Sequence, residues 1–305
     1  MRIRLSTVLA GLLGLATALS VAAPPAQAAP TKSTATIASQ LVLEPTDFGY
    51  RGSVQVELTY RGAAPGRARY VITEPIPGSY YNEEWGVTCY SGGELLPDHR
   101  TRVECDVPGG ELTPGERRVF TVDFRVLTTV QPYAMKAGNG QLDVTVDGRA
   151  VTSGKFSTLF RATTGSLANP KQYVRDERPD VSVSVTGGVT LVRQPDGTFA
   201  GRMPVTLRYN GDAPHNSIWY EARGLPEGVW EPWIEGCVIG CVPGDAFMEG
   251  EVRTFEFLVE ARPGTALGEV GDVTVEFFAS TSYPAPDLNP ADNLVTFPVT
   301  VTEAA

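Results

Sequence analysis

Short runs of alternating apolar and polar residues, bounded by Gly, Pro, Asn and Asp, recur along the chain after its first 28 residues. A period of two is typical of half-buried β-strands, and helical spacing of apolar residues is nearly absent. The alternation predicts three buried faces, formed by Val54, Val56, Leu58 and Tyr60, by Phe120, Val122 and Phe124, and by Val181, Val183 and Val185. Asp196-Gly197 predicts a hairpin turn, because this pair accepts a positive φ. The pattern therefore predicts an all-β protein.

The second part of the chain repeats the first. Residues 54–89 align with 203–237, residues 105–126 with 241–261, and residues 138–148 with 267–277, in the same order and at similar spacing. Such self-similarity indicates a duplicated module. Each copy has several strands at regular spacing over about 130 residues, which fits a two-sheet antiparallel β-sandwich. We expect domains over residues 29–163 and 180–305, joined by a polar, Pro-bearing linker over residues 164–179.

Three segments of the chain resemble a known repeat. The succession of Tyr-Arg-Gly at 60–62, EPIPGS at 74–79 and the run over 85–126 resembles the bacterial Ig-like repeat called domain of unknown function eleven. Related modules of cell-adhesion type end similarly, and DLNPADNLVTFPVTV (287–301) looks like their Asp-x-Asn-Pro-x-x-Asn ending. The resemblance implies two tandem antiparallel Ig-like β-sandwich domains that act as spacers, adhesion modules or surface-layer components. Two departures are FMEGEVR (247–253) in place of LTPGERR (112–118), and the missing ending in the first copy.

The first 28 residues have the composition of a signal peptide. Arg2 and Arg4 precede an apolar stretch over residues 5–21, and Ala26-Gln27-Ala28 fits the A-x-A cleavage rule. We expect cleavage between Ala28 and Ala29, export from the cell, and no membrane span after processing. The formal net charge of −10, without basic clusters, argues against nucleic acid and anionic lipid as partners.

Four cysteines in an exported chain favour disulfides. The aligned copies place one pair in each, Cys89 with Cys105 and Cys237 with Cys241. A redox dithiol is normally C-x-x-C before a helix, whereas the second pair has three intervening residues within strand and turn. Zinc needs about four ligands, and the chain's two histidines, His99 and His215, lie at no ligand spacing from the cysteines. We therefore expect two structural disulfides and no cofactor or metal.

Aromatic residues gather after a Pro-Gly-type turn in each copy. They are Tyr80, Tyr81 and Trp85 in GSYYNEEWG, and Trp230 and Trp233 in GVWEPWIEG. Exposed rings flanked by carboxylates can stack on sugars, and Tyr and Trp also anchor protein partners. We expect instead that one ring per copy fills the core while the others shield the disulfide.

No catalytic or metal motif stands out. The chain lacks G-x-S-x-G, and both histidines are expected to be solvated turn residues. An enzyme would need two carboxylates, or a histidine and an acid, to converge in a cleft. Asp287, Asn289 and Asp292 offer oxygens of the kind calcium uses, but without EF-hand spacing, so we expect them to form a turn.

The sequence therefore favours a secreted, non-enzymatic structural or interaction protein of adhesion type, with an unidentified protein or polysaccharide partner. The alternative is a carbohydrate-binding protein of the cell surface or of secreted polysaccharide. It needs either Trp230 and Trp233, or Tyr80, Tyr81 and Trp85, to be exposed and coplanar.

Overall fold

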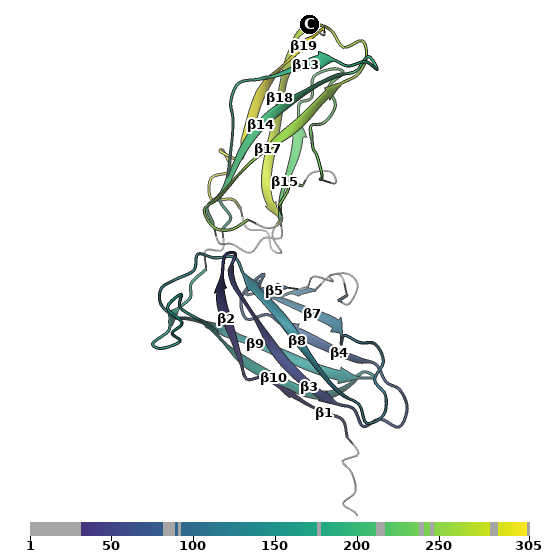
Figure 1. Ribbon diagram of the computed structural model, residues 1–305, viewed down its shortest axis with the longest axis vertical. Helices are drawn as coiled ribbons and strands as arrows, with labels where there is room; N and C mark the ends of the chain where they lie inside the picture. The colour runs from purple at the N-terminus through teal and green to yellow at the C-terminus, as the bar shows by residue number, and fades with distance from the viewer. Residues whose placement is uncertain are drawn as a thin grey trace, which may run out of the picture. The chain divides into compact units, whose positions relative to one another are not determined.

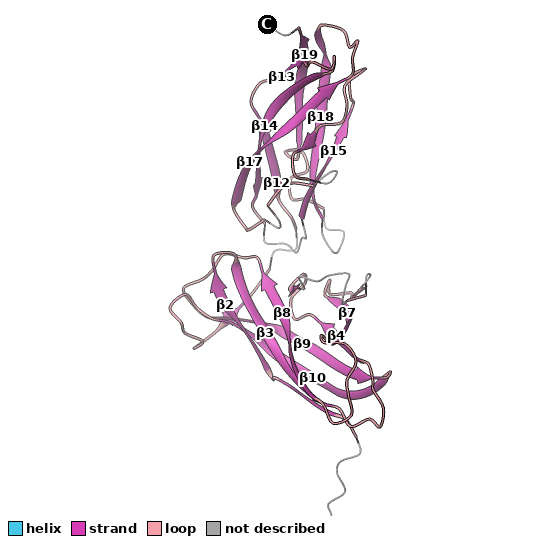
Figure 2. Cartoon of the chain, turned by 45° about the vertical axis from the view of Figure 1, so that its right-hand side comes forward, coloured by secondary structure: helices cyan, strands magenta, loops and turns pink. Residues whose placement is uncertain are grey.

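A computed structural model of the chain describes residues 32–81, 89–90, 93–175, 178–211, 217–237, 241–244, 247–280 and 286–303. Every regular element in these ranges is a β-strand (Figures 1 and 2). The strands form two separate curled sheets, here called the first half (residues 34–172) and the second half (residues 181–302). The all-β prediction is confirmed. The signal-peptide prediction for residues 1–28 lies outside the described residues.

The first half has eleven strands in the order β5-β8-β3-β2-β10-β9-β4-β7-β6, with β1 added to β3 and β11 added to β9. Their bounds are β1 (Thr34–Ile37), β2 (Gln40–Thr46), β3 (Gly49–Thr59), β4 (Ala68–Thr73), β5 (Tyr80–Tyr81), β6 (Glu94–Leu95), β7 (Thr101–Asp106), β8 (Arg117–Val126), β9 (Met135–Val146), β10 (Arg149–Phe160) and β11 (Lys171–Gln172). We call β5-β8-β3 the β3 arm and β10-β9-β4-β7-β6 the β10 arm. β11 lies within the segment expected to be a linker.

Strand β2 joins the two arms because it changes partner along its length. Residues 40–43 pair in parallel with residues 157–160 of β10, and residues 44–46 pair antiparallel with β3. This crossing brings the β2 backbone close to Gly52 of β3. A Cβ atom at Gly52 would overlap the carbonyl oxygen of Val42, so the crossing requires a residue without a side chain.

The two arms of the first half pack against one another. Side chains from both arms form one buried core, which includes the expected face of Val54, Val56, Leu58 and Tyr60. Phe124 of β8 lies 5.6 Å from Phe156 of β10, measured between ring centroids. The opposite face of β8 carries exposed Val119, Thr121 and Asp123, as the alternation predicts.

The second half has eight strands in the order β15-β18-β19-β13-β14-β17-β16, with β12 added to β14. Their bounds are β12 (Val181–Val185), β13 (Val189–Arg193), β14 (Phe199–Tyr209), β15 (Ser217–Arg223), β16 (Trp233–Ile234), β17 (Glu251–Ala261), β18 (Gly268–Ser280) and β19 (Leu294–Thr302). Apart from β6, β7 and β11, this order matches the first half strand for strand. The expected hairpin turn joins β13 and β14, with Gly197 at φ 88°.

The second half repeats the partner change. Residues 189–192 of β13 pair in parallel with β19, and residues 192–193 pair antiparallel with β14. A Cβ atom at Gly201 of β14 would overlap the carbonyl oxygen of Thr190. Gly52 and Gly201 occupy matching positions, each two residues before the buried face of the aligned strand. Both halves therefore depend on a glycine at the same crossing.

In each half, an arginine side chain binds one or more carbonyl groups of a neighbouring loop. Arg118 donates to the carbonyl oxygens of Pro108 (3.1 Å) and Gly110 (2.6 Å) and to Glu116, whose carboxylate accepts the Thr113 N–H at 2.8 Å. Arg253 likewise donates to Pro243 at 3.0 Å and to Glu251. The sequence difference between LTPGERR and FMEGEVR thus leaves the working Glu and Arg in place.

The crossing glycines yield a direct test. Gly52→Ala and Gly201→Ala should each lower the free energy of unfolding by about 1–3 kcal/mol, because the new methyl group meets backbone that cannot move aside cheaply. Ser53→Ala, beside Gly52 on an exposed position, is the matched control and should change stability by less than about 0.5 kcal/mol. Urea unfolding measures all three. Wild-type stability in both glycine variants would contradict the close crossing.

Candidate functional site

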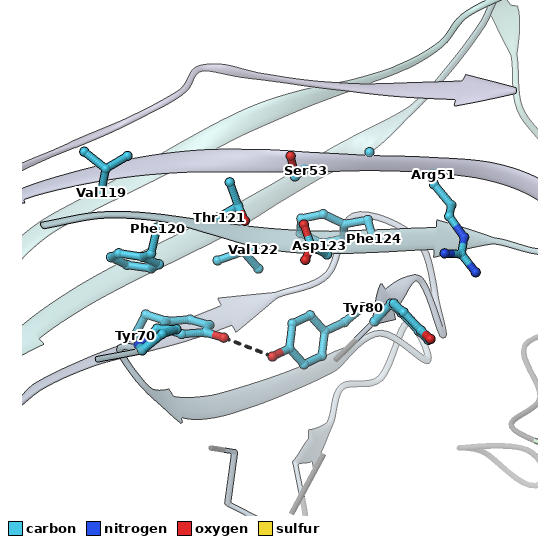
Figure 3. A pocket seen from close by; sticks show the side chains of 13 residues that line it. Arg51, Ser53, Tyr70, Tyr80, Val119, Phe120, Thr121, Val122, Asp123 and Phe124 are labelled. Atoms are coloured by element: carbon cyan, nitrogen blue, oxygen red, sulfur yellow. Dashed lines mark hydrogen bonds between the residues drawn. The ribbon is translucent and has the colours of Figure 1, made fainter. Parts of the chain in front are cut away.

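A cavity of about 740 Å³ lies along β8 in the first half (Figure 3). It has an apolar floor from the inward side chains of β8 and a polar side from the outward ones. The lining residues are Arg51, Gly52, Ser53, Tyr70, Tyr80, Tyr81, Pro108, Val119, Phe120, Thr121, Val122, Asp123 and Phe124. Two of the aromatic residues singled out from the sequence, Tyr80 and Tyr81, therefore meet at this site.

The buried carboxylate of Glu74 shapes the turn that delivers these tyrosines. Its Oε1 accepts the N–H of Gly78 at 2.9 Å and of Thr101 at 2.6 Å, and its Oε2 accepts the N–H of Tyr80 at 3.1 Å. Gly78 has a φ of 67°, which favours glycine. Burial raises the pKa of Glu74 above its usual value, against the opposing effect of the three N–H groups. The turn leads directly into β5, which pairs with residues 123–124 of β8.

Tyr80 covers the first disulfide. Its hydroxyl lies 3.0 Å from Sγ of Cys89, 3.1 Å from Sγ of Cys105 and 3.1 Å from the hydroxyl of Tyr70. Burial, with the neighbouring Tyr80, raises the pKa of Tyr70. This is the shielding role expected for part of the aromatic set.

Tyr81 points to the outer side of the sheet, where two arginines stack on it. The guanidinium carbon of Arg125 lies 4.3 Å from the ring centroid, and that of Arg51 lies 5.4 Å away. Cation–π contacts of this kind hold arginine side chains in place at a surface. Tyr81 therefore organises charged groups at the rim of the cavity.

Both predicted disulfides are present. Cys89 is disulfide-bonded to Cys105 of β7, and Cys237 is disulfide-bonded to Cys241. Cys89 and Cys105 also form an isolated β-bridge through their backbones. The backbone of Cys241 forms an isolated β-bridge with Trp219 of β15. The first disulfide therefore lies beside β4, where Cys105 pairs with Tyr70. The second lies beside β15, the strand of the second half that corresponds to β4. Two disulfides indicate an oxidising environment.

Trp230 and Trp233 lie on the surface of the second half. Trp230 is 46% exposed and Trp233 is 40% exposed. The backbone N–H of Trp230 donates to the Glu260 carbonyl at 2.9 Å, and Nε1 of Trp233 donates to the Glu260 carboxylate at 3.3 Å. Neither indole fills the core of this half, so the expected core role is wrong for both. Trp85, the fifth residue of the predicted set, lies outside the described residues.

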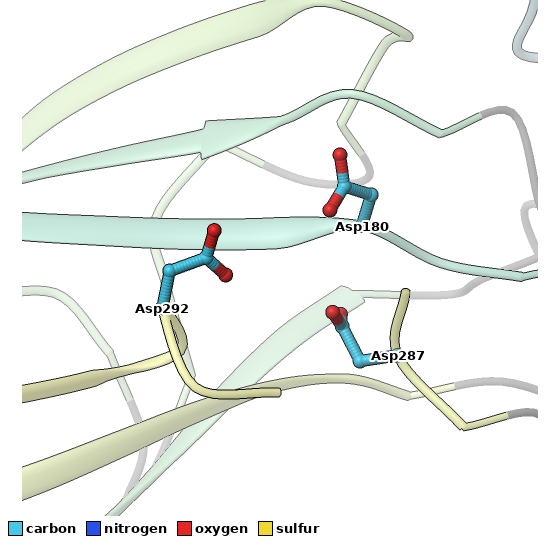
Figure 4. A group of neighbouring side chains, drawn as sticks. All are labelled: Asp180, Asp287 and Asp292. Carbon is cyan, nitrogen blue, oxygen red and sulfur yellow. The ribbon is translucent and has the colours of Figure 1, made fainter. Parts of the chain in front are cut away.

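Three carboxylates converge where β12 begins (Figure 4). Oxygens of Asp180, Asp287 and Asp292 all lie within 4.8 Å of one another. Asp287 accepts the N–H groups of Val181 and Asn289, each at 2.9 Å, and Asp292 accepts the side-chain amide of Asn289 at 2.8 Å. These bonds show the turn-forming role expected for Asp287, Asn289 and Asp292. Asp180 was not anticipated, because it is over 100 positions away in sequence.

His99 is not among the residues that line the cavity. His99 is half-buried in the turn between β6 and β7, at a φ of 61°. The expectation that it is a turn residue holds, although it is less solvated than expected. His215 lies outside the described residues.

In the described part of the second half, two exposed aromatic residues were not anticipated from the sequence. Trp219 of β15 is 36% exposed and Phe278 of β18 is 43% exposed. A signal was available, because Trp219-Tyr220 and Phe277-Phe278 are each consecutive large apolar residues in a strand. Neighbours in a strand point to opposite faces, so one member of each pair has to face outward.

No family model matches the chain, and no curated protein matches it in sequence. Among solved structures, a protein of unknown function from Porphyromonas gingivalis W83 is similar over 88% of this chain and 98% of its own, at 10% identity and a TM-score of 0.24. Red sea bream transglutaminase is similar over 90% of this chain and 32% of its own, at 12% identity and a TM-score of 0.22. At these TM-scores neither likeness identifies a fold or an activity for this chain.

Across the described ranges, no helix has the length and apolar character needed to cross a membrane.

The two disulfides should differ in their effect on stability. Their loops span 16 and 4 residues, so chain entropy predicts losses of about 3 kcal/mol for Cys89→Ala with Cys105→Ala and about 2 kcal/mol for Cys237→Ala with Cys241→Ala. Urea unfolding measures both losses. The unreduced wild type should weigh about 4 Da less than its all-thiol form. An unchanged unfolding midpoint in the Cys89→Ala, Cys105→Ala variant would contradict the assignment of the Cys89–Cys105 disulfide.

Glu74 should make stability depend on pH. Its pKa is raised in the folded protein, so the native state binds the proton more tightly than the unfolded chain. This contribution is complete below the unfolded value of about 4.5 and is lost as pH rises through the folded pKa. Glu74→Gln should abolish that pH dependence and lower stability near pH 4 by about 1–3 kcal/mol, because its amide cannot accept the Tyr80 N–H. The loss should be smaller near pH 7, where the wild type has lost its own contribution.

Urea unfolding between pH 4 and 8 measures both effects of the Glu74 substitution. Glu104→Gln, at an exposed carboxylate, is the control and should keep the wild-type pH profile. A Glu74→Gln profile parallel to that of the wild type would contradict the raised pKa.

Proposed function

We propose that the chain is an exported extracellular protein built from two tandem Ig-like β-sandwich domains, which acts by binding and not by catalysis. Three features support the sandwich proposal. The strand order is the same in both halves apart from β6, β7 and β11. Each half has a single buried core, and the disulfides fit an oxidising compartment. The resemblance of residues 60–126 and 287–301 to bacterial Ig-like repeats of adhesion type gives the proposal its functional class.

The proposed organisation follows the sequence. Residues 1–28 are the signal peptide, 29–163 and 180–305 the two domains, and 164–179 the linker. β11 falls in this linker and pairs in parallel with β9, so part of the linker extends the first sheet.

The observation that carries the binding proposal is the exposure of Trp230 and Trp233. Large aromatic side chains are normally buried, and an exposed pair held on ordered backbone is typical of a contact surface. β16 pairs with β17 at Trp233, and Trp230 is bonded through its backbone to Glu260. The proposed role is therefore an interaction or adhesion module at the cell exterior.

Carbohydrate binding is the second candidate function. The two indoles meet one of its two requirements, because both are exposed. Arg202 of β14 pairs with Glu256 of β17 and with Glu235, which directly follows β16, so hydrogen-bonding groups for sugar hydroxyls lie near Trp233. Tyr80 and Tyr81 support this candidate less, since one covers the disulfide and the other stacks with arginines.

Co-sedimentation of the mature protein with cell-wall fractions tests the binding proposal. We expect retention on at least one fraction, and a loss of about tenfold or more in the Trp230→Ala, Trp233→Ala variant. Phe48→Ala removes an equally exposed ring of the first half and should bind as the wild type does. Wall fractions treated with protease separate the partners, because a polysaccharide survives the treatment and a protein does not.

Retention on no fraction by a folded protein would overturn the binding proposal. Retention that protease treatment abolishes would remove the carbohydrate candidate and keep the interaction module.

A further inference from the structure

Trp219 and Phe278 form an exposed aromatic pair on the outward face of the second half. They stand directly opposite one another in the antiparallel pairing of β15 with β18. Opposed residues of this kind have Cβ atoms about 5 Å apart on the same face of the sheet. Their sequence neighbours Tyr220 and Phe277 are buried, so the exposed pair is fixed by the register that builds the core.

The backbone beneath this pair is held on both sides. On one side, the pairing of β18 with β19 reaches Glu276, and the Phe277 N–H donates to the Asn293 carbonyl at 2.9 Å. On the other side, Cys241 forms an isolated bridge with Trp219, and the Val242 N–H donates to the Ile218 carbonyl at 3.1 Å. The Cys237–Cys241 disulfide closes this loop. The disulfide thus anchors the edge of the strand that carries Trp219.

A row of charged side chains follows the aromatic row on the same face. Glu221 stands opposite Glu276, two residues along the strands and therefore about 7 Å away. Arg223 lies 3.9 Å from the Glu221 carboxylate and also contacts Glu276. The guanidinium group thereby holds two carboxylates that would otherwise repel one another.

We propose that Trp219 and Phe278 form a polysaccharide-binding platform. One pyranose ring lies with its apolar C–H face on the two aromatic rings, and the next sugar offers its hydroxyls to Glu221, Arg223 and Glu276. This inference rests on the proposed extracellular binding function. It is a separate site from Trp230 and Trp233, which belong to the opposite end of the strand order.

The size and composition of the patch favour a sugar over a protein. A stable protein interface needs about 800 Å² from each partner around an apolar centre. Among the described residues, the apolar centre consists of two rings and the diagonal Leu294, and charged residues begin one row away. A sugar ring needs only one aromatic surface together with nearby donors and acceptors, which is what the two rows provide.

The test uses the whole mature protein and three insoluble probes, chitin, cellulose and protease-treated cell-wall polysaccharide. We expect binding to at least one probe. Trp219→Ala with Phe278→Ala should weaken it by about tenfold or more. Trp219→Tyr with Phe278→Tyr should retain most of it, because the stacking surface remains. Matched thermal melts show that each variant is folded.

Phe48→Ala is the control, since it removes an exposed ring of the first half and should bind as the wild type does. The Trp230→Ala, Trp233→Ala variant tells the two candidate sites apart. If that variant alone loses binding, the platform proposal is overturned while carbohydrate binding stands. If no probe retains the folded wild type, or if only protease-sensitive wall material does, the polysaccharide proposal is overturned. The proposal of an extracellular interaction module survives in the last case.

Discussion

The fold depends on one strand in each half that changes partner along its length. β2 and β13 each pair in parallel with the last long strand of their half and then antiparallel with the third. Without that change, the two arms would be separate sheets, and the edges of β3 and β10 that now meet β2 would be unpaired. The crossing forces two backbones together, and a side chain at Gly52 or Gly201 would occupy the space of the crossing carbonyl. The cost of this close approach is conformational entropy, because a glycine loses more backbone freedom on folding than any other residue.

Once the arms are joined, the alternation of each strand determines both the core and the surface. Inward aromatic residues meet edge to face, for example Tyr220 and Phe257, whose centroids are 4.9 Å apart. The outward residues cannot join that core, so consecutive aromatics leave one ring exposed. The exposed Trp and Phe residues of the second half lie on, or a few residues before, strands at or next to the two ends of its sheet. The disulfides add support at one of these ends.

The sequence predicts which face of a strand is buried, but it does not predict where β2 and β13 cross the neighbouring strands. Alternation placed Val54, Val56 and Leu58 in the core, and the aligned copies paired all four cysteines correctly. The roles of Gly52 and Gly201 went unrecognised, because each glycine is required by a carbonyl about ten residues earlier in the chain. The exposure of Trp230 depends on backbone pairing with Glu260, which no local pattern specifies. Asp180 joins Asp287 and Asp292 only after β12 meets the final turn of the second half.

Amide hydrogen exchange on the mature protein tests the central claim most directly. The partner change predicts slow exchange for the ladder amides of residues 40–43 with 157–160 and of residues 189–192 with 299–302, comparable with the central strands β3 and β14. Fast exchange in these segments, with β3 and β14 still protected, would mean that the arms are not joined through β2 and β13. The account of both halves would then be wrong.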